Sequence, residues 1–115
     1  MKNNHFFGIY AEKFAIFFLF IKGYKILAWR YKTPFGEIDI IAKKNNFLIF
    51  IEVKSTKNKN LNIEIALRKD QINRMFRAIN YFTKTNKQLQ KMPHRIDFIE
   101  FKGYFSLKHH CNFIS

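Results

Sequence analysis

The chain has 115 residues, 48% of them hydrophobic and 18% aromatic, which excludes a disordered chain and favours one packed domain spanning residues 1–115. Lys and Arg number 21 against 8 Asp and Glu, and this charge of +13 favours a polyanionic partner such as nucleic acid. The most apolar run, Phe14 to Ile21, is much shorter than the roughly 20 residues of a membrane span, so we expect no membrane partner. A single cysteine, Cys111, cannot form an internal disulfide, which favours the cytoplasm.

The expected elements follow the order α-β-β-β-α-β. Residues 5–22 lack proline and are apolar on nearly all sides, which predicts a largely covered helix ended by Gly23. The remaining elements are strands at 24–31, 37–43 and 47–55, a helix at 64–83 and a strand at 95–101. The tail from Lys102 has no clear pattern. This order predicts an α/β fold with a mixed sheet flanked by helices, and a parallel crossover between the last two strands.

The second and third strands are expected to form a hairpin around Asn45-Asn46, a pair that tolerates the positive φ of a tight turn. A two-residue turn there pairs Lys44 with Phe47 and fixes the register of both strands. One face of this hairpin is then wholly apolar and is expected to be core. Its members are Ile38, Ile40, Ala42, Ile49, Ile51 and Val53.

The same register gathers four charged side chains on the other face. It sets Asp39 opposite Glu52 and Glu37 opposite Lys54. Opposed side chains lie about 5 Å apart at Cβ, so the two carboxylates repel unless a proton or a cation lies between them. A divalent ion such as Mg²⁺ fits this arrangement. In the alternative interpretation Glu37 and Lys54 form a cross-strand ion pair and the other two acids face solvent, which leaves their opposition unexplained.

Residues 36–42 (GEIDIIA) and 50–54 (FIEVK) resemble the motif of the PD-(D/E)XK, or restriction endonuclease-like, nuclease superfamily. Within it the chain is most similar to the YraN-like family, and it is also similar to archaeal Holliday junction resolvases. Ile38 stands where the superfamily name places proline. Weaker matches extend the resemblance over nearly the whole chain, at Gly8, Glu12, Gly23-Tyr24, Trp29-Arg30, Lys69, Ala78, Tyr81, Arg95, Asp97 and Asn112-Phe113. The resemblance implies a restriction endonuclease-like fold.

The resemblance also implies roles for individual residues. Asp39 and Glu52 would bind Mg²⁺ or Mn²⁺, and Glu12 would join them from the first helix. Lys54 would orient the attacking water and stabilise charge on the scissile phosphate, with Glu37 as an accessory carboxylate. The implied activity is metal-assisted phosphodiester hydrolysis, with DNA favoured over RNA and branched DNA over a fixed sequence. Because relatives that cut branched junctions act as dimers, a homodimer is a further expectation.

Basic residues outside this motif are candidate contacts to a nucleic-acid backbone. They are Arg30, Lys57, Lys59, Arg68, Lys69, Arg74 and Arg77. A solvated surface in a chain whose abundant Lys, Asn, Ile and Phe reflect coding bias is the competing explanation. Trp29 and Tyr31 either stack on bases or belong to the core.

Other signals favour different functions. His109-His110-Cys111 offers zinc ligands, but tetrahedral zinc needs three or four and we expect no others. A catalytically silent nucleic-acid-binding module would need only the basic surface. A basic assembly partner, for instance on ribosomal or membrane complexes, would need no metal site. Neither alternative uses the set of Asp39, Glu52 and Lys54.

Overall fold

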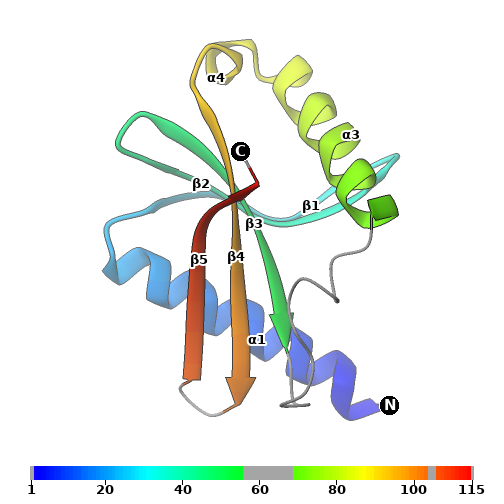
Figure 1. Cartoon of the computed structure of the whole chain (residues 1–115), viewed down its shortest axis with the longest axis vertical. Coiled ribbons are helices and arrows are strands. Elements are labelled where there is room, and N and C mark those ends of the chain that lie inside the picture. The colour runs from blue at the N-terminus through cyan, green and yellow to red at the C-terminus, as the bar shows by residue number, and fades with distance from the viewer. Residues whose placement is uncertain (1, 56–68, 104–105, 115) are drawn as a thin grey trace.

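A computed structural model describes residues 2–55, 69–103 and 106–114 of the chain (Figure 1). Its elements are α1 (Lys2–Ile21), β1 (Lys25–Thr33), β2 (Gly36–Lys44), β3 (Phe47–Ser55), α3 (Lys69–Thr85), α4 (Lys87–Gln90), β4 (His94–Gly103) and β5 (Ser106–Ile114). Residues 64–68 of the expected second helix lie outside the described residues. In the described part, neither α1 nor any other helix is long and apolar enough to cross a bilayer.

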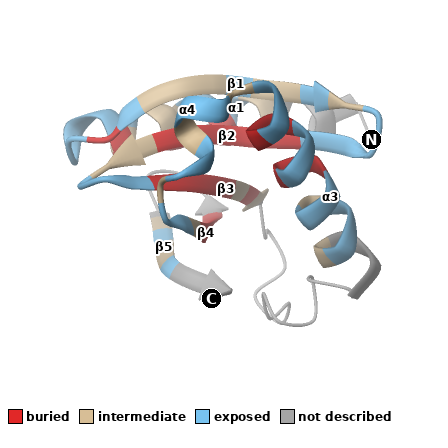
Figure 2. Ribbon diagram, turned by 90° about the horizontal axis from the view of Figure 1, so that it is seen from above, coloured by how far each residue is buried: buried red, intermediate tan, exposed pale blue. Residues whose placement is uncertain are grey.

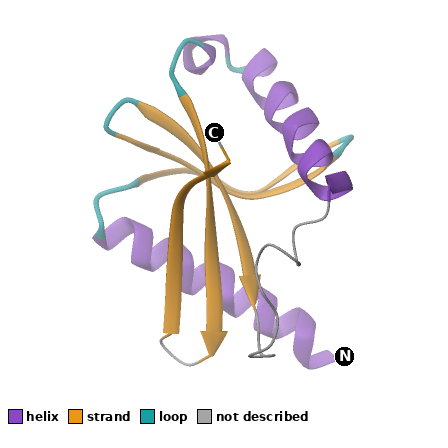
Figure 3. Ribbon diagram, in the orientation of Figure 1, coloured by secondary structure: helices purple, strands orange, loops and turns teal. Residues whose placement is uncertain are grey.

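The strands form one mixed sheet in the order β1-β2-β3-β4-β5. The pair β3–β4 is parallel and the other neighbours are antiparallel, which confirms the predicted crossover. Figure 3 shows the sheet between α1 on one side and α3 on the other. This arrangement fits the restriction endonuclease-like α/β fold.

Besides the short helix α4, the element that the sequence did not indicate is strand β5. Its positions next to β4 hold His109 and His110, whose Nε2 atoms lie 2.8 Å from carboxylate oxygens of Asp97 and Glu100, respectively. Because polar partners replace the usual apolar residues, β5 lacks the alternation that marks a half-buried strand.

Two tight turns follow the predictions. Gly23 has a φ of 91° just after α1, and the Tyr24 amide donates to the Leu19 carbonyl at 3.0 Å. Asn45 and Asn46 have φ values of 51° and 67°, as a two-residue hairpin turn requires. The β2–β3 ladder then runs from the pair Lys44–Phe47 to the pair Ile40–Ile51 in the predicted register.

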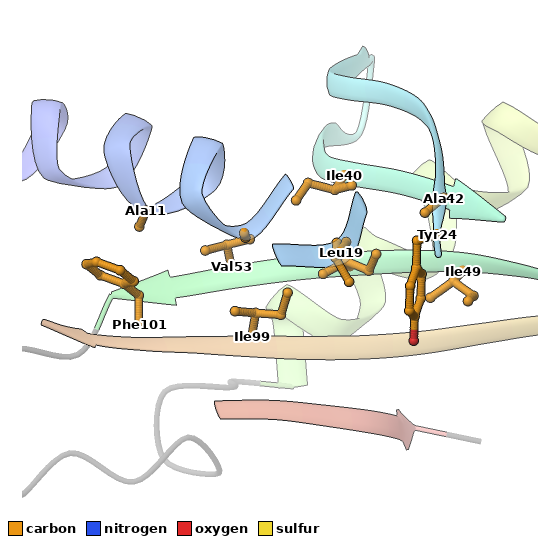
Figure 4. Packing of buried hydrophobic residues seen from close by; sticks show 11 residues of the cluster. Ala11, Leu19, Tyr24, Ile40, Ala42, Ile49, Val53, Ile99 and Phe101 are labelled. Carbon is orange, nitrogen blue, oxygen red and sulfur yellow. The ribbon is translucent and has the colours of Figure 1, made fainter. Parts of the chain in front are cut away.

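The sheet has a core on each face. On one face, α1 contributes Ala11, Ala15 and Leu19, and Figure 4 shows its side chains directed at strand residues such as Val53 and Ile99. On the other face, α3 covers a second buried cluster: Ile38, Ile41, Leu48, Phe50, Ala78, Ile79, Phe82, Ile96 and Phe98. Strands β2 and β3 are therefore buried along much of their length (Figure 2). Helix α3 also covers the hairpin face on which the charged residues were expected, and Glu37, Glu52 and Lys54 lie beside α3 residues.

One member of the predicted apolar face lies elsewhere. Ile40 packs in the cluster under α1, whereas Ile38, two residues away, packs in the cluster under α3. The neighbouring strand changes face at the same point: Ile40 pairs with Trp29 and Ile38 with Tyr31, and Tyr31 packs in the α3 cluster. Between Trp29 and Tyr31, Arg30 has a φ of 55°, a left-handed conformation that rotates the strand locally. Strict alternation, on which the prediction relied, fails there.

Candidate active site

The candidate site begins where β2 and β3 separate. The last pair of their ladder is Ile40–Ile51, and Asp39 and Glu52 are the next residue along each strand. The backbone N–H of Val53 donates to Oδ2 of Asp39 at 2.9 Å, so a side chain replaces the ladder at this point. The expected cross-strand pairing of Asp39 with Glu52 is accordingly absent from the described ladder, although the two carboxylates remain neighbours.

Asp39 and Glu52 form a buried acidic pair. Asp39 is 9% exposed, and the side chain of Glu52 is 18% exposed. Burial and the charge of Glu12 together raise the pKa of Asp39 to about 6, against the lowering effect of the Val53 amide. Burial and the charge of Asp39 hold the pKa of Glu52 well above its ordinary value. These acids therefore lie in a position where a cation would favour their charged forms.

Lys54 and Glu37 extend the site on the α3 side. Lys54 Nζ lies 3.7 Å from Glu52 Oε1, and Glu37 Oε1 lies 4.0 Å from Arg30 Nε. The ion pair between Glu37 and Lys54, considered as an alternative from the sequence, is therefore replaced by these two contacts. A pocket of about 170 Å³ opens beside them. Its described lining residues are Gly36, Glu37, Glu52, Lys54, Arg74, Met75 and Ala78.

Glu12 approaches the site from α1. It is 8% exposed, and its Oε1 accepts hydrogen bonds at 2.9 Å from both Trp29 Nε1 and Arg30 Nε. Arg30 Nη2 lies 3.5 Å from the other oxygen, Oε2. Because the charge of Glu12 acts on Asp39, the fold brings the helix carboxylate within electrostatic range of the strand acids, as the resemblance implied.

The structure describes the side chains of three of the predicted basic residues, Arg30, Arg74 and Arg77. Arg74 lines the pocket and Arg77 is exposed further along α3, while the guanidinium of Arg30 faces Glu12 and Glu37. Lys69 begins α3. Lys57, Lys59 and Arg68 lie outside the described residues.

The two aromatic residues of β1, Trp29 and Tyr31, differ in their environment. Tyr31 packs in the α3 core, with its ring centroid 5.0 Å from that of Phe82. Trp29 is exposed over 41% of its surface and lies under the Nζ of Lys13, 5.8 Å from the ring centroid. The contact of its indole N–H with Glu12 was not expected from the sequence, because it forms only where β1 lies against α1.

A second polar cluster joins β4 and β5. Asp97, fully buried, adds a third possible metal ligand to His109 and Cys111, which the sequence analysis did not foresee. Both carboxylate oxygens of Asp97 already accept bonds from Arg95 at 2.9 Å, however. Lys22 Nζ donates to His109 Nδ1 at 3.0 Å, which places the proton on Nε2, the nitrogen that donates to Asp97. The contacts thus favour a structural network over a zinc site.

Comparison with known proteins identifies one family. The model of "Uncharacterised protein family UPF0102" matches residues 11–101. A UPF0102 protein of Dictyoglomus turgidum is 38% identical over 96 residues, covering 83% of this chain and 80% of that protein. One of Campylobacter lari is 41% identical over 87 residues, covering 74% and 75%. A third, of Thermodesulfovibrio yellowstonii, is 62% identical over 47 residues, covering 41% and 42%.

Proposed function

The chain belongs to the UPF0102, or YraN-like, family, which implies the restriction endonuclease-like superfamily, and on this basis we propose that it is a metal-dependent nuclease. The observation that carries the proposal is the buried pair Asp39 and Glu52 at the separation of two strands, with Lys54 beside it. A purely structural role for two neighbouring buried acids would be costly, because like charges in a low-dielectric environment repel.

The residues present fit a hard divalent cation. Asp39, Glu52 and Glu12 offer only oxygen donors, the ligands that Mg²⁺ and Mn²⁺ prefer, and their excess of negative charge is what such an ion offsets. When bound, the ion would neutralise charge on the phosphate and lower the pKa of a water molecule. The Val53 amide, by bonding Asp39 Oδ2, holds that carboxylate in a fixed orientation toward the site.

The other residues of the site would act on the substrate. Lys54 brings its ammonium group to the pocket, where it would orient the attacking water and stabilise the negative charge that develops on the phosphate. Glu37, on the pocket wall, is the accessory carboxylate. Arg74 on the opposite wall would bind a phosphate of the nucleic-acid backbone.

The substrate that this proposal favours is branched or structured DNA, cut in the cytoplasm by a homodimer. The preference for branched DNA, like the dimer, comes from the similarity to junction resolvases. The charge of +13 supports nucleic acid in general, because it draws polyanions to the molecule without regard to sequence.

A substrate panel tests the proposal. Single-stranded, duplex, flapped and four-way-junction DNA, together with RNA, would each be incubated with Mg²⁺, Mn²⁺ or a chelator. The variants Asp39→Asn and Glu52→Gln, checked for folding by circular dichroism, serve beside the wild type. We expect metal-dependent cleavage that both variants lose. Nucleic-acid binding without cleavage by the wild type would contradict the proposal and favour a silent binding module.

A further inference from the structure

Arg30 is placed where its backbone conformation is unfavourable for a long side chain. It lies inside β1 and has a φ of 55°, in the left-handed region that glycine and asparagine adopt most readily. Among the described residues, the other positive φ values at non-glycine positions belong to Asn45 and Asn46 in the hairpin turn. Backbone strain of this kind clusters at functional sites. A long side chain at a strained position therefore indicates that the side chain has a function.

The contacts of Arg30 indicate what that function is. Its Nε donates to Glu12 Oε1 at 2.9 Å and lies 4.0 Å from Glu37 Oε1, so one guanidinium lies between two carboxylates of the site. Trp29 pairs with Ile40 on the α1 side of the sheet, and its indole N–H donates to the same Oε1 at 2.9 Å. Two rigid donors from adjacent residues thus fix one oxygen of Glu12.

The second oxygen of Glu12 is held less tightly. Among the described residues, its partner is Arg30 Nη2 at 3.5 Å, the outer limit of a hydrogen bond. Metal-ligating side chains are commonly oriented by hydrogen bonds from neighbouring residues. Glu12, with one oxygen held by two donors and the other held weakly, has this arrangement. The orientation of Glu12 would then depend on Trp29 and Arg30 rather than on its own rotamer preference.

We propose that Trp29 and Arg30 are positioning residues that hold Glu12 as a ligand for the divalent ion. This inference rests on the proposed function, and it gives Arg30 a different role from the contact to nucleic acid expected from the sequence. The left-handed conformation of Arg30 places its guanidinium on the same carboxylate oxygen that the indole of Trp29 contacts.

The sign of the effect on metal affinity separates this role from a simple charge effect. Removing a positive charge near a cation site strengthens cation binding when the charge acts only through space. Removing a positioning residue weakens it, by about 10-fold or more for the partners of metal ligands. Arg30→Asn removes the guanidinium and retains a residue that accepts the left-handed backbone.

The test is the affinity for Mn²⁺ alone, measured by electron paramagnetic resonance without nucleic acid. We expect Arg30→Asn to bind Mn²⁺ about 10-fold more weakly than the wild type. Trp29→Phe, which keeps the ring and removes the N–H, is expected to weaken binding by a smaller factor. Arg30→Lys keeps the positive charge but lacks the planar guanidinium, and its Mn²⁺ affinity is expected to lie between those of Arg30→Asn and the wild type. Lys25→Asn on the same strand controls for the loss of one charge and is expected to bind as the wild type does.

Folding of each variant is checked by thermal melting, and Trp29→Phe keeps the test open if Arg30→Asn fails to fold. Unchanged or tighter Mn²⁺ binding in folded Arg30→Asn, with weaker DNA binding, would overturn the inference and make Arg30 a phosphate contact. Wild-type Mn²⁺ affinity in Trp29→Phe would show that Trp29 does not position Glu12. If the wild type neither binds Mn²⁺ nor cleaves nucleic acid, the proposed function fails as well. If the wild type does both, variants that lack the expected weaker Mn²⁺ binding contradict this inference alone.

Discussion

Asp39 combines two roles in one side chain. Its carboxylate accepts the Val53 N–H where the β2–β3 ladder ends, and it is also the buried acid next to Glu52. The first role needs only an acceptor oxygen, which asparagine also supplies. The second needs a negative charge, which is unfavourable in the metal-free protein because burial disfavours it. Substitution by asparagine therefore separates charge from hydrogen bonding.

We expect Asp39→Asn to stabilise the metal-free protein at high pH. The folded protein binds a proton at Asp39 with a pKa of about 6, above the ordinary value of 3.8, so the stability of the wild type falls as the pH rises from about 3.8 to about 6 and stays lower above that range. The variant lacks this cost, which corresponds to about 1–3 kcal/mol at about pH 8. The difference should vanish as the pH falls through about 6 toward about 4. Urea denaturation in the presence of a chelator measures it, and equal stability at about pH 8 would contradict the burial of a charged Asp39.

Lys54 should affect the rate of reaction more than substrate binding. Its ammonium lies 3.7 Å from Glu52 and lines the pocket, so Lys54→Met removes the positive charge where negative charge would develop. We expect single-turnover cleavage to slow by about 100-fold or more, with a smaller change in DNA affinity. The charge of Lys54 also lowers the pKa of Glu52, so the rate profile of the variant should shift to higher pH. A wild-type rate in Lys54→Met would remove this residue from the mechanism.

The strands of the hairpin carry the site at one end and a tight turn at the other. Asn46 has a φ of 67°, which a β-branched residue tolerates poorly. We therefore expect Asn46→Val to lower the free energy of unfolding by about 1–3 kcal/mol and Asn46→Gly to leave it nearly unchanged. Chemical denaturation of the two variants measures this. Equal destabilisation by both would show that the side chain of Asn46, and not its backbone conformation, matters.

Helix α3 presents two arginines in different settings. Both are exposed, but Arg74 lines the pocket beside Glu37, Glu52 and Lys54, whereas Arg77 is not among the described residues that line it. We expect Arg77→Ala to weaken binding equally across DNA sequences and to reduce the dependence of affinity on salt by about one counterion. Arg74→Ala should in addition slow cleavage of bound DNA. Fluorescence anisotropy over a salt series, followed by single-turnover cleavage, distinguishes the two, and identical effects would contradict the separate roles.

The sequence was informative where local chemistry determines structure. The pair Asn45-Asn46 predicted the turn and hence the hairpin register, and the apolar spacing predicted both helices and the central strands. It failed where tertiary contacts decide. The face change at Arg30 breaks the alternation that placed Ile38 on one face with Ile40, and the histidines of β5 find their partners only once β4 lies beside them. For the site, the motif predicted the acids, whereas the contact of Trp29 with Glu12 depends on the packing of β1 against α1.

At the scale of the whole molecule, the acidic residues are concentrated at one site of a positively charged chain. Four of the eight acids, namely Glu12, Glu37, Asp39 and Glu52, gather around one site in a chain whose net charge is +13. A positive molecule attracts a polyanion from a distance, while the acidic site requires a cation before a phosphate can approach. DNA binding should therefore weaken steeply with salt, and cleavage should depend on the divalent ion separately.

The metal dependence of cleavage, compared between the wild type and Asp39→Asn, tests the central claim most directly. Both proteins, confirmed as folded, would be titrated with Mg²⁺ on the substrate that the panel ranks first. We expect the wild-type rate to rise to a plateau and to vanish with a chelator, and the variant to remain at least about 100-fold slower at every Mg²⁺ concentration. Cleavage that persists in the chelator, or a wild-type rate in Asp39→Asn, would contradict a metal-dependent nuclease centred on this carboxylate.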